Sequence, residues 1–223
     1  MATKFLIDGP DRAKQTILLA HGAGGPMDSE VMTGAAKALA DSGFRVARFE
    51  FDYMAARRRA AGRKPPPRAE KLFPEYLAAI DALEATGPLK GPLIIGGKSM
   101  GGRIASMIAD DLHAAGRVAG LLCLGYPFHP PGKPEQLRTA HLAKMKTPAL
   151  IVQGTRDPFG TRQEVSTYAL SKTIEILWLE GGDHDLKPRK SVSGFSAADH
   201  LKTSAQAASA WARRIVGSRY GRT

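Results

Sequence analysis

The stretch Leu93–Arg103, with the sequence LIIGGKSMGGR, most constrains how this chain can fold. Its first residues, Leu-Ile-Ile, are typical of a buried β-strand. Apolar side chains then recur at the spacing of one face of a helix: Ile104, Met107, Ile108 and Leu112. A strand that passes directly into a helix at Ser99, with a glycine two residues to either side, predicts a sharp turn that presents the serine hydroxyl.

A phosphate-binding P-loop is the competing interpretation, because Gly97-Lys98-Ser99 matches the end of that motif. The motif requires a glycine where this chain has Pro92, and Gly91 lies one residue too early. It also requires a flexible loop whose N–H groups converge on phosphate, whereas Leu93–Ile95 favours a strand. We therefore favour the G-x-S-x-G turn, which places a nucleophilic serine between a strand and a helix.

Apolar runs alternate with longer amphipathic stretches along the chain, which predicts an α/β fold. Several runs are continuously apolar, as expected for parallel strands that helices cover on both faces. The expected strands are Lys4–Asp8, Thr16–Ala20, Arg45–Phe51, Pro92–Gly96, Gly120–Gly125, Ala149–Gln153 and Thr173–Leu179. The expected helices are Asp28–Ser42, Ala69–Ala85, Met100–Ala115, Arg162–Leu170 and Asp199–Val216. We expect a single domain over residues 1–223, with a doubly wound, mostly parallel sheet of about seven strands.

The net charge of +11 is concentrated partly between Arg57 and Arg68 and partly near the C-terminus. Basic surfaces can attract nucleic acid or anionic membranes. No zinc spacing, aromatic RNA-binding signature or helix-turn-helix pattern accompanies these charges. We interpret them as a solvated surface and expect neither a nucleic-acid partner nor a membrane partner. Ala60–Arg68, which contains three consecutive prolines, predicts a stiff extended loop.

The single cysteine, Cys123, lies in an apolar run, so an intrachain disulfide is excluded and a buried thiol is expected. No apolar run approaches the ~18 residues of a membrane helix. Met1–Phe5 shows no apolar signal segment. Together these features favour a cytoplasmic protein.

A nucleophilic serine needs a base, and the base needs an orienting acid. In this arrangement the acid and then the base follow the serine in the chain, each just beyond a later strand. Asp157 and His184 each lie just beyond an expected strand, in that order after Ser99. Alone, each would be a turn aspartate or a surface histidine, but three matches in order favour a catalytic triad. Asp183 and Asp185 stay open as alternative acids.

A tetrahedral oxyanion needs backbone donors. One expected donor is the N–H of Met100, at the start of the helix after the serine. The second is expected in the glycine-rich loop His21–Gly25, where we assign it to Ala23 with Gly24 as the rival. His21 is expected to hold this loop through side-chain hydrogen bonds, and a catalytic role for it is the less favoured alternative.

At these motifs the chain resembles the α/β-hydrolase superfamily. More narrowly, His21–Gly25, Gly96–Arg103 and Gly125–Pro134 resemble the small, lidless KANL3/Tex30-like hydrolases. The chain is similar, more distantly, to dienelactone hydrolases, which carry cysteine where this chain has Ser99. The resemblance implies the same triad and no cofactor or metal. It also implies that some eukaryotic relatives are scaffold components rather than enzymes.

Residues 127–147 leave room for a loop and one short helix, so we expect no cap domain and a shallow, open site. The candidates for the substrate-binding rim lie just past strand ends or beside catalytic loops, with core packing as the alternative for each. These candidates are Met27, Tyr53, Tyr126, Phe128 and Phe159. The run Arg57–Arg59 could lie at the same face and favour an acidic or phosphorylated substrate.

These expectations together describe a serine hydrolase that cleaves a small ester or thioester through an acyl-enzyme. Its expected partner is a small-molecule acyl substrate. The alternative is a non-catalytic interaction module that kept the fold. A missing triad member would indicate that alternative, and none is missing from this sequence.

Overall fold

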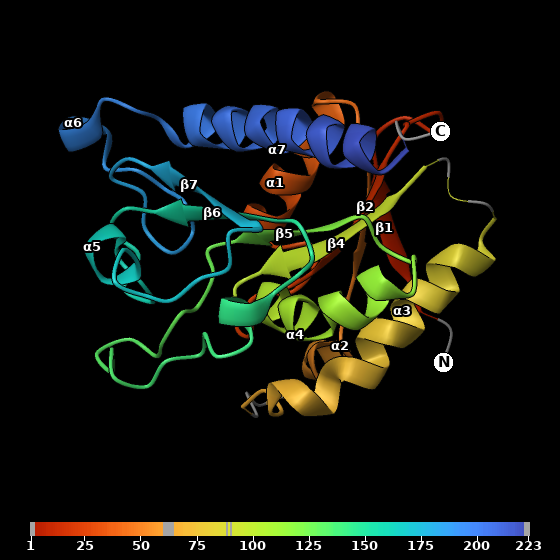
Figure 1. The fold of residues 1–223 in the computed structure, drawn as a ribbon, viewed down its shortest axis with the longest axis horizontal. Coiled ribbons are helices and arrows are strands. Elements are labelled where there is room, and N and C mark those ends of the chain that lie inside the picture. The colour runs from red at the N-terminus through yellow and green to blue at the C-terminus, as the bar shows by residue number, and fades with distance from the viewer. Residues whose placement is uncertain (1–2, 60–64, 88, 90, 221–223) are drawn as a thin grey trace.

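Seven strands form one sheet in the computed structural model, which describes residues 3–59, 65–87, 89 and 91–220 (Figure 1). The strands lie in the order β1-β3-β2-β4-β5-β6-β7, and every neighbouring pair is parallel except β1 with β3. Their bounds are Phe5–Asp8, Thr16–Ala20, Arg45–Phe49, Leu93–Lys98, Gly120–Leu124, Ala149–Gly154 and Ile174–Leu179 for β1 to β7. The expected mostly parallel, seven-stranded sheet is confirmed.

Helices cover both faces of the sheet, which explains the continuously apolar strands. One face carries α1 (Glu30–Asp41) and α7 (Ala197–Tyr220), and the other carries α3 (Phe73–Ala85) and α4 (Met100–Ala114) (Figure 1). Successive side chains of a strand point to opposite faces. In β2, Ile17 and Leu19 therefore pack toward α1 and α7, whereas Leu18 packs toward α3 and α4.

The chain leaves β3 two residues earlier than expected and forms a helix, α2 (Asp52–Arg59), that the sequence analysis missed. Phe51 donates its backbone N–H to the ring nitrogen Nε2 of His21 (3.1 Å) instead of to a neighbouring strand. Met54 is the one fully buried residue among those of α2 whose burial the structure describes, so the helix lacks the apolar stripe that would have revealed it.

Two expected helices are shorter than their patterns suggested. The expected helix Ala69–Ala85 begins as the 3₁₀ turn η1 (Ala69–Leu72), and α3 then starts at Phe73, with a proline in its first turn. The expected helix Arg162–Leu170 ends after one turn, as α5 (Arg162–Val165). The hydroxyls of Ser166 and Thr167 bond to the carbonyls of Gln163 and Glu164, and such local bonds compete with helix continuation. A further short helix, α6 (Lys190–Ser193), was not expected.

Within the described residues, no helical cap covers the carboxyl edge of the sheet. Between β5 and β6 the single regular element is a 3₁₀ turn, η2 (Leu142–Lys144). Of the expected extended loop Ala60–Arg68, residues 60–64 lie outside the described part of the chain, and residues 65–68 form neither helix nor strand. Among the helices of the described ranges, none combines the length and the apolar character needed to cross a bilayer.

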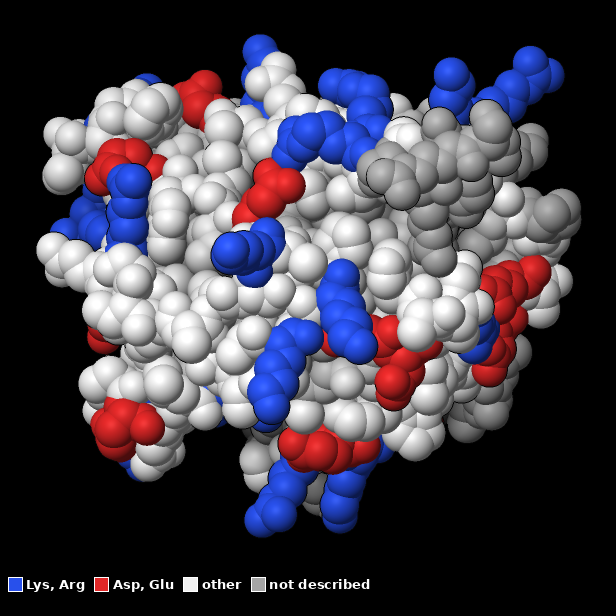
Figure 2. Space-filling model, in the orientation of Figure 1, with Lys and Arg blue, Asp and Glu red and all other residues white. Residues whose placement is uncertain are grey.

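Basic residues are distributed among acidic ones on the face that Figure 2 shows. At the start of the basic segment, Arg58 forms ion pairs with Asp28 and Glu50. Arg57 donates to the carbonyl oxygen of Ala23 (3.0 Å) and lies over the ring of Tyr53 (5.1 Å). These two arginines therefore brace neighbouring loops, while the side chain of Arg59 lies outside the described part.

Candidate active site

Ser99 occupies the turn between β4 and α4 with backbone angles φ 49° and ψ −114°. A non-glycine residue with positive φ is uncommon and marks a strained turn. The strain is possible because neighbouring glycines let strand and helix approach closely. A Cβ atom at Gly97 or Gly101 would collide with the carbonyl oxygen of Ala20 on β2. The sequence motif thus raises the Ser99 side chain at the carboxyl edge of the sheet.

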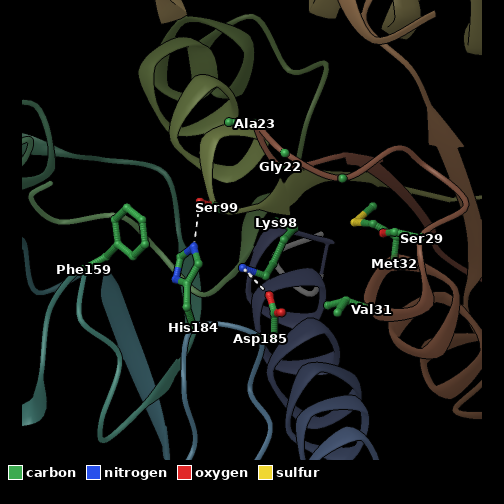
Figure 3. A pocket seen from close by; sticks show the side chains of 12 residues that line it. Gly22, Ala23, Ser29, Val31, Met32, Lys98, Ser99, Phe159, His184 and Asp185 are labelled. Carbon is green, nitrogen blue, oxygen red and sulfur yellow. Dashed lines mark hydrogen bonds and ion pairs between the residues drawn. The ribbon is translucent and has the colours of Figure 1, made fainter. Parts of the chain in front are cut away.

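A continuous chain of hydrogen bonds joins Ser99, His184 and Asp157. The Oγ atom of Ser99 lies 2.9 Å from Nε2 of His184, and Nδ1 of the same ring lies 2.8 Å from Oδ2 of Asp157 (Figure 3 shows the first contact). The ring of Phe159 stacks on His184 at 4.1 Å between centroids. The loops after β6 and β7 therefore bring the expected acid and base together with the serine, at hydrogen-bond distance.

Asp157 is fully buried, and two donors fix its carboxylate besides the imidazole. The side-chain amide of Gln153 donates to Oδ2 (2.9 Å), and the backbone N–H of Phe159 donates to Oδ1 (2.9 Å). The alternative acids are occupied elsewhere. Asp183 accepts the backbone N–H groups of Asp185 and Lys187, and the Asp185 carboxylate faces Lys98. The structure therefore places Asp157, rather than either alternative, on His184.

The glycine-rich loop after β2 borders the same space as Ser99 (Figure 3). The Tyr53 hydroxyl lies within 3.3 Å of the Ala23 carbonyl oxygen, to which Arg57 also donates. These contacts hold the loop beside the turn. Met100 begins α4 next to Ser99, where unpaired N–H groups and the helix dipole favour negative charge. Ala23 and Met100 stay predictions as oxyanion donors.

His21 is fully buried and holds the glycine-rich loop to the start of α2. Its Nε2 atom accepts the N–H of Phe51, so Nδ1 carries the proton and donates to the carbonyl of Gly22 (2.7 Å). Burial lowers the pKa of His21 and keeps the ring neutral. The contacts agree with the expected structural role.

Two of the five rim candidates were wrong. Tyr126 and Phe128 are fully buried, and their rings pack together at 4.9 Å. The backbone N–H of Tyr126 is bonded to the buried side chain of Gln153 (2.7 Å), which keeps the chain below the surface after β5. A position just past a strand end does not specify whether a side chain points outward, so the pattern could not distinguish rim from core.

The other three candidates lie nearer the site. Phe159 lines the cavity, whereas Met27 and Tyr53 are partly buried and do not line it. Tyr53 instead contacts the back of the glycine-rich loop through its hydroxyl. It therefore supports the cavity wall from behind.

A cavity of about 440 Å³ opens beside Ser99, a size that suits a small ligand. It is lined by Gly22, Ala23, Gly24, Gly25, Ser29, Val31, Met32, Lys98, Ser99, Phe159, His184 and Asp185. The sequence analysis missed the contribution of α1 and its preceding loop, and it missed Lys98, which stands within the serine motif itself. Within the described ranges, no three His, Cys, Asp or Glu side chains are grouped so that they could hold a metal ion.

With this geometry in view, comparison with known proteins identifies the family. Residues 13–213 match the family described as alpha/beta hydrolase domain, and the chain belongs to this family. The expected superfamily is thereby confirmed, at a coarser level than the KANL3/Tex30-like group.

Curated relatives share about a quarter to a third of the aligned residues. A protein of Pongo abelii named putative protein-lysine deacylase ABHD14B is 29% identical over 153 residues, which cover 68% of this chain and 66% of that protein. Its namesake in Rattus norvegicus is 27% identical over 176 residues, which cover 76% of this chain and 74% of the relative. The alignments thus span about two thirds to three quarters of these relatives.

Solved structures share the fold at low identity. An alpha-beta serine hydrolase homologue from Coxiella burnetii has a TM-score of 0.65 and 23% identity, covering 82% of this chain and 83% of its own. A serine hydrolase without lid from Xanthomonas campestris has a TM-score of 0.66 and 19% identity, with coverage of 96% and 89%. A dienelactone hydrolase from Anabaena variabilis has a TM-score of 0.69 and 20% identity, with coverage of 96% and 92%.

Proposed function

We propose that this protein is a serine hydrolase that cleaves a small ester or thioester through an acyl-enzyme. The observation that carries the proposal is the unbroken hydrogen-bond chain from Ser99 through His184 to Asp157, which ends at an open cavity. A serine becomes a nucleophile when a positioned base accepts its proton, and the base is effective when an acid fixes its tautomer.

In the proposed reaction, Ser99 Oγ attacks the substrate carbonyl carbon while His184 Nε2 takes the hydroxyl proton. Asp157 stabilises the resulting imidazolium. The N–H groups of Met100 and Ala23 are the proposed donors to the oxyanion. Collapse of the intermediate breaks the bond to the leaving group, which receives the proton from His184. A water molecule, deprotonated by His184, then releases the acid and restores Ser99.

The proposed substrate is a small molecule, because the cavity is modest and the described segment between β5 and β6 holds no cap that could shape a long acyl tunnel. The chemistry uses side chains and backbone groups alone and requires no cofactor. We place the protein in the cytoplasm and, more narrowly, among the KANL3/Tex30-like hydrolases.

Labelling with a fluorophosphonate, followed by intact-mass analysis, tests the proposal. The wild type should gain one adduct, and Ser99→Ala should gain none. Ser106→Ala is the matched control, because it removes a hydroxyl from the helix that follows Ser99, away from the cavity. A folded wild type that stays unlabelled would contradict the proposal and would favour the interaction module.

A panel of small esters and thioesters then defines the substrate. An acyl-lysine peptide belongs in that panel, because the ABHD14B relatives carry the name putative protein-lysine deacylase.

A further inference from the structure

Lys98 places a positive charge in the wall of the cavity, next to the serine. It is the residue immediately before Ser99, it lines the cavity, and its side chain is only 7% exposed. Figure 3 shows its ammonium group pointing between His184 and Asp185. The proposed hydrolysis makes no use of this charge.

Backbone at two glycines lies close to the Lys98 side chain. Gly125 adopts φ +64°, and a Cβ atom there would lie 3.2 Å from Nζ of Lys98. Nearer the base of the side chain, a Cβ atom at Gly22 would lie 3.6 Å from Cγ of the lysine. Two segments distant in the sequence therefore leave a slot that this side chain fills. A side chain packed in this way loses little conformational freedom when it binds a ligand.

The partner of Lys98 is held loosely. The Oδ1 atom of Asp185 lies 3.4 Å from Nζ, longer than the 2.7–2.9 Å typical of a charge-assisted hydrogen bond. The Asp185 side chain is 51% exposed, so water can solvate its carboxylate if it moves away. The Lys98 ammonium group is buried and cannot be solvated by water in the same way. Burial disfavours its charge and lowers its pKa, and the nearby carboxylates, Asp185 foremost, oppose that shift.

The geometry points to Lys98 as a specificity-determining residue that binds a carboxylate carried by the substrate, in the place that Asp185 occupies in the free protein. This inference rests on the proposed function. A Cβ atom at Gly125 would lie 3.2 Å from Nζ of Lys98 and 3.4 Å from Nδ1 of His184, so a carboxylate bound to Lys98 would stand close to the base that serves Ser99. The substrate class is therefore the half-ester or half-thioester of a short dicarboxylic acid.

The carboxylate belongs on the acyl side of the scissile bond. An anionic acyl group stays attached to Ser99 after the leaving group departs, so its contact with Lys98 would persist through both chemical steps. The net charge of +11 also favours the approach of anions over cations. The sequence-based hypothesis assigned anion selection to Arg57–Arg59, but Arg57 and Arg58 do not line the cavity.

Competition against fluorophosphonate labelling tests the inference and does not require the natural substrate. Monomethyl succinate and methyl succinamate contain the same ester, but only the first carries a carboxylate. In the wild type, the concentration that slows Ser99 labelling by half should be about tenfold or more lower for monomethyl succinate than for methyl succinamate. Lys98→Met, which keeps side-chain length without charge, should remove this difference.

Lys187→Met is the matched control, because it removes a lysine charge near the same loop from a residue that does not line the cavity. It should keep the wild-type preference. Equal slowing by the two esters in the wild type would overturn the inference while leaving the proposed function intact, as would a preference that survives in Lys98→Met. A wild type that the probe never labels would overturn both. If Lys98→Met fails to fold, Lys98→Gln, which also removes the charge and keeps a polar side chain, takes its place in the same comparison.

Discussion

Two serines, one in the turn before α4 and one within the helix, each contact a histidine, and only one of them has the surroundings of a nucleophile. Ser99, at the start of the helix, lies 2.9 Å from Nε2 of His184. Ser106, farther along the same helix, lies 2.8 Å from Nε2 of His141. By this distance alone the two pairs are equivalent, so the difference must lie in what surrounds them.

The surroundings of Ser106 favour structure over chemistry. Its hydroxyl donates to the carbonyl of Arg103 (2.7 Å) and contacts the Tyr126 hydroxyl (3.1 Å), and the residue is only 3% exposed. Burial, with the nearby charge of Arg103, lowers the pKa of His141 to about 4. The first pair instead has Asp157 behind its imidazole and an open cavity in front. A nucleophile therefore needs an orienting acid and room for a substrate, besides a nearby histidine.

Removal of each serine hydroxyl in turn should give the largest difference in kcat between the two pairs. Ser99→Ala should lower kcat for ester hydrolysis by several orders of magnitude, since loss of a triad serine costs ~10⁶ in a well-studied protease. Ser106→Ala should keep kcat within about threefold of wild type, because it does not line the cavity. Steady-state kinetics on a small ester measures both variants. Comparable losses in the two would mean that the geometric distinction is not functional.

The next largest effect is expected at the acid. Asp157→Asn keeps the shape but should lower kcat on the order of 10³-fold or more, because an amide can hold His184 in the wrong tautomer. Asp110→Asn is the control, since Asp110 bonds to the backbone and side chain of Thr147 and its charge acts on His141 instead. Pre-steady-state and steady-state rates on the same ester compare them. A small loss of kcat in Asp157→Asn would contradict the proposed role of this carboxylate.

The loss of stability should be larger for Ser106→Ala than for Ser99→Ala, which is the reverse of the order expected for activity. Ser106→Ala removes a buried hydroxyl that bonds to three groups and should cost about 1–3 kcal/mol of unfolding free energy. Ser99→Ala should change stability by less than about 1 kcal/mol, because its hydroxyl faces the cavity. Urea denaturation followed by circular dichroism measures both. A larger loss in Ser99→Ala would contradict the division between a structural and a chemical serine.

The smallest effect concerns the loss of stability at low pH. The folded-state pKa of His141 is lowered to about 4, below its ordinary value near 6.5, so the unfolded chain takes up its proton first. Its contribution to stability is fully present above about pH 6.5 and is lost as the pH falls toward 4. The unfolding free energy should therefore drop less between pH 7 and pH 5 in His141→Gln than in the wild type. His21, whose pKa is also lowered, acts in the same direction in both proteins. Parallel pH profiles in urea denaturation would contradict this assignment.

The sequence could predict the sheet and the three residues joined by hydrogen bonds because each depends on local order. A strand, a glycine-flanked serine and a helix specify one turn, and Asp157 and His184 each follow a strand at the same sheet edge. The structure shows these side chains within hydrogen-bond distance. Their catalytic roles stay predictions until the variants are measured.

What the sequence could not predict depends on contacts between distant segments. The α2 helix is held by ion pairs of Arg58 with Asp28 and Glu50. No local periodicity in the sequence indicates such contacts. The inward direction of Tyr126 depends on Gln153, from another strand. The slot around Lys98 is formed by Gly22 and Gly125, which lie far apart in the chain.

Mapping of the modified residue tests the central claim most directly. Wild-type protein is labelled with a fluorophosphonate under native conditions, digested, and the adduct is located by tandem mass spectrometry. We predict an adduct on Ser99 alone, formed at the wild-type rate in Ser106→Ala as well. An adduct on Ser106, or equal labelling of several serines, would contradict the account.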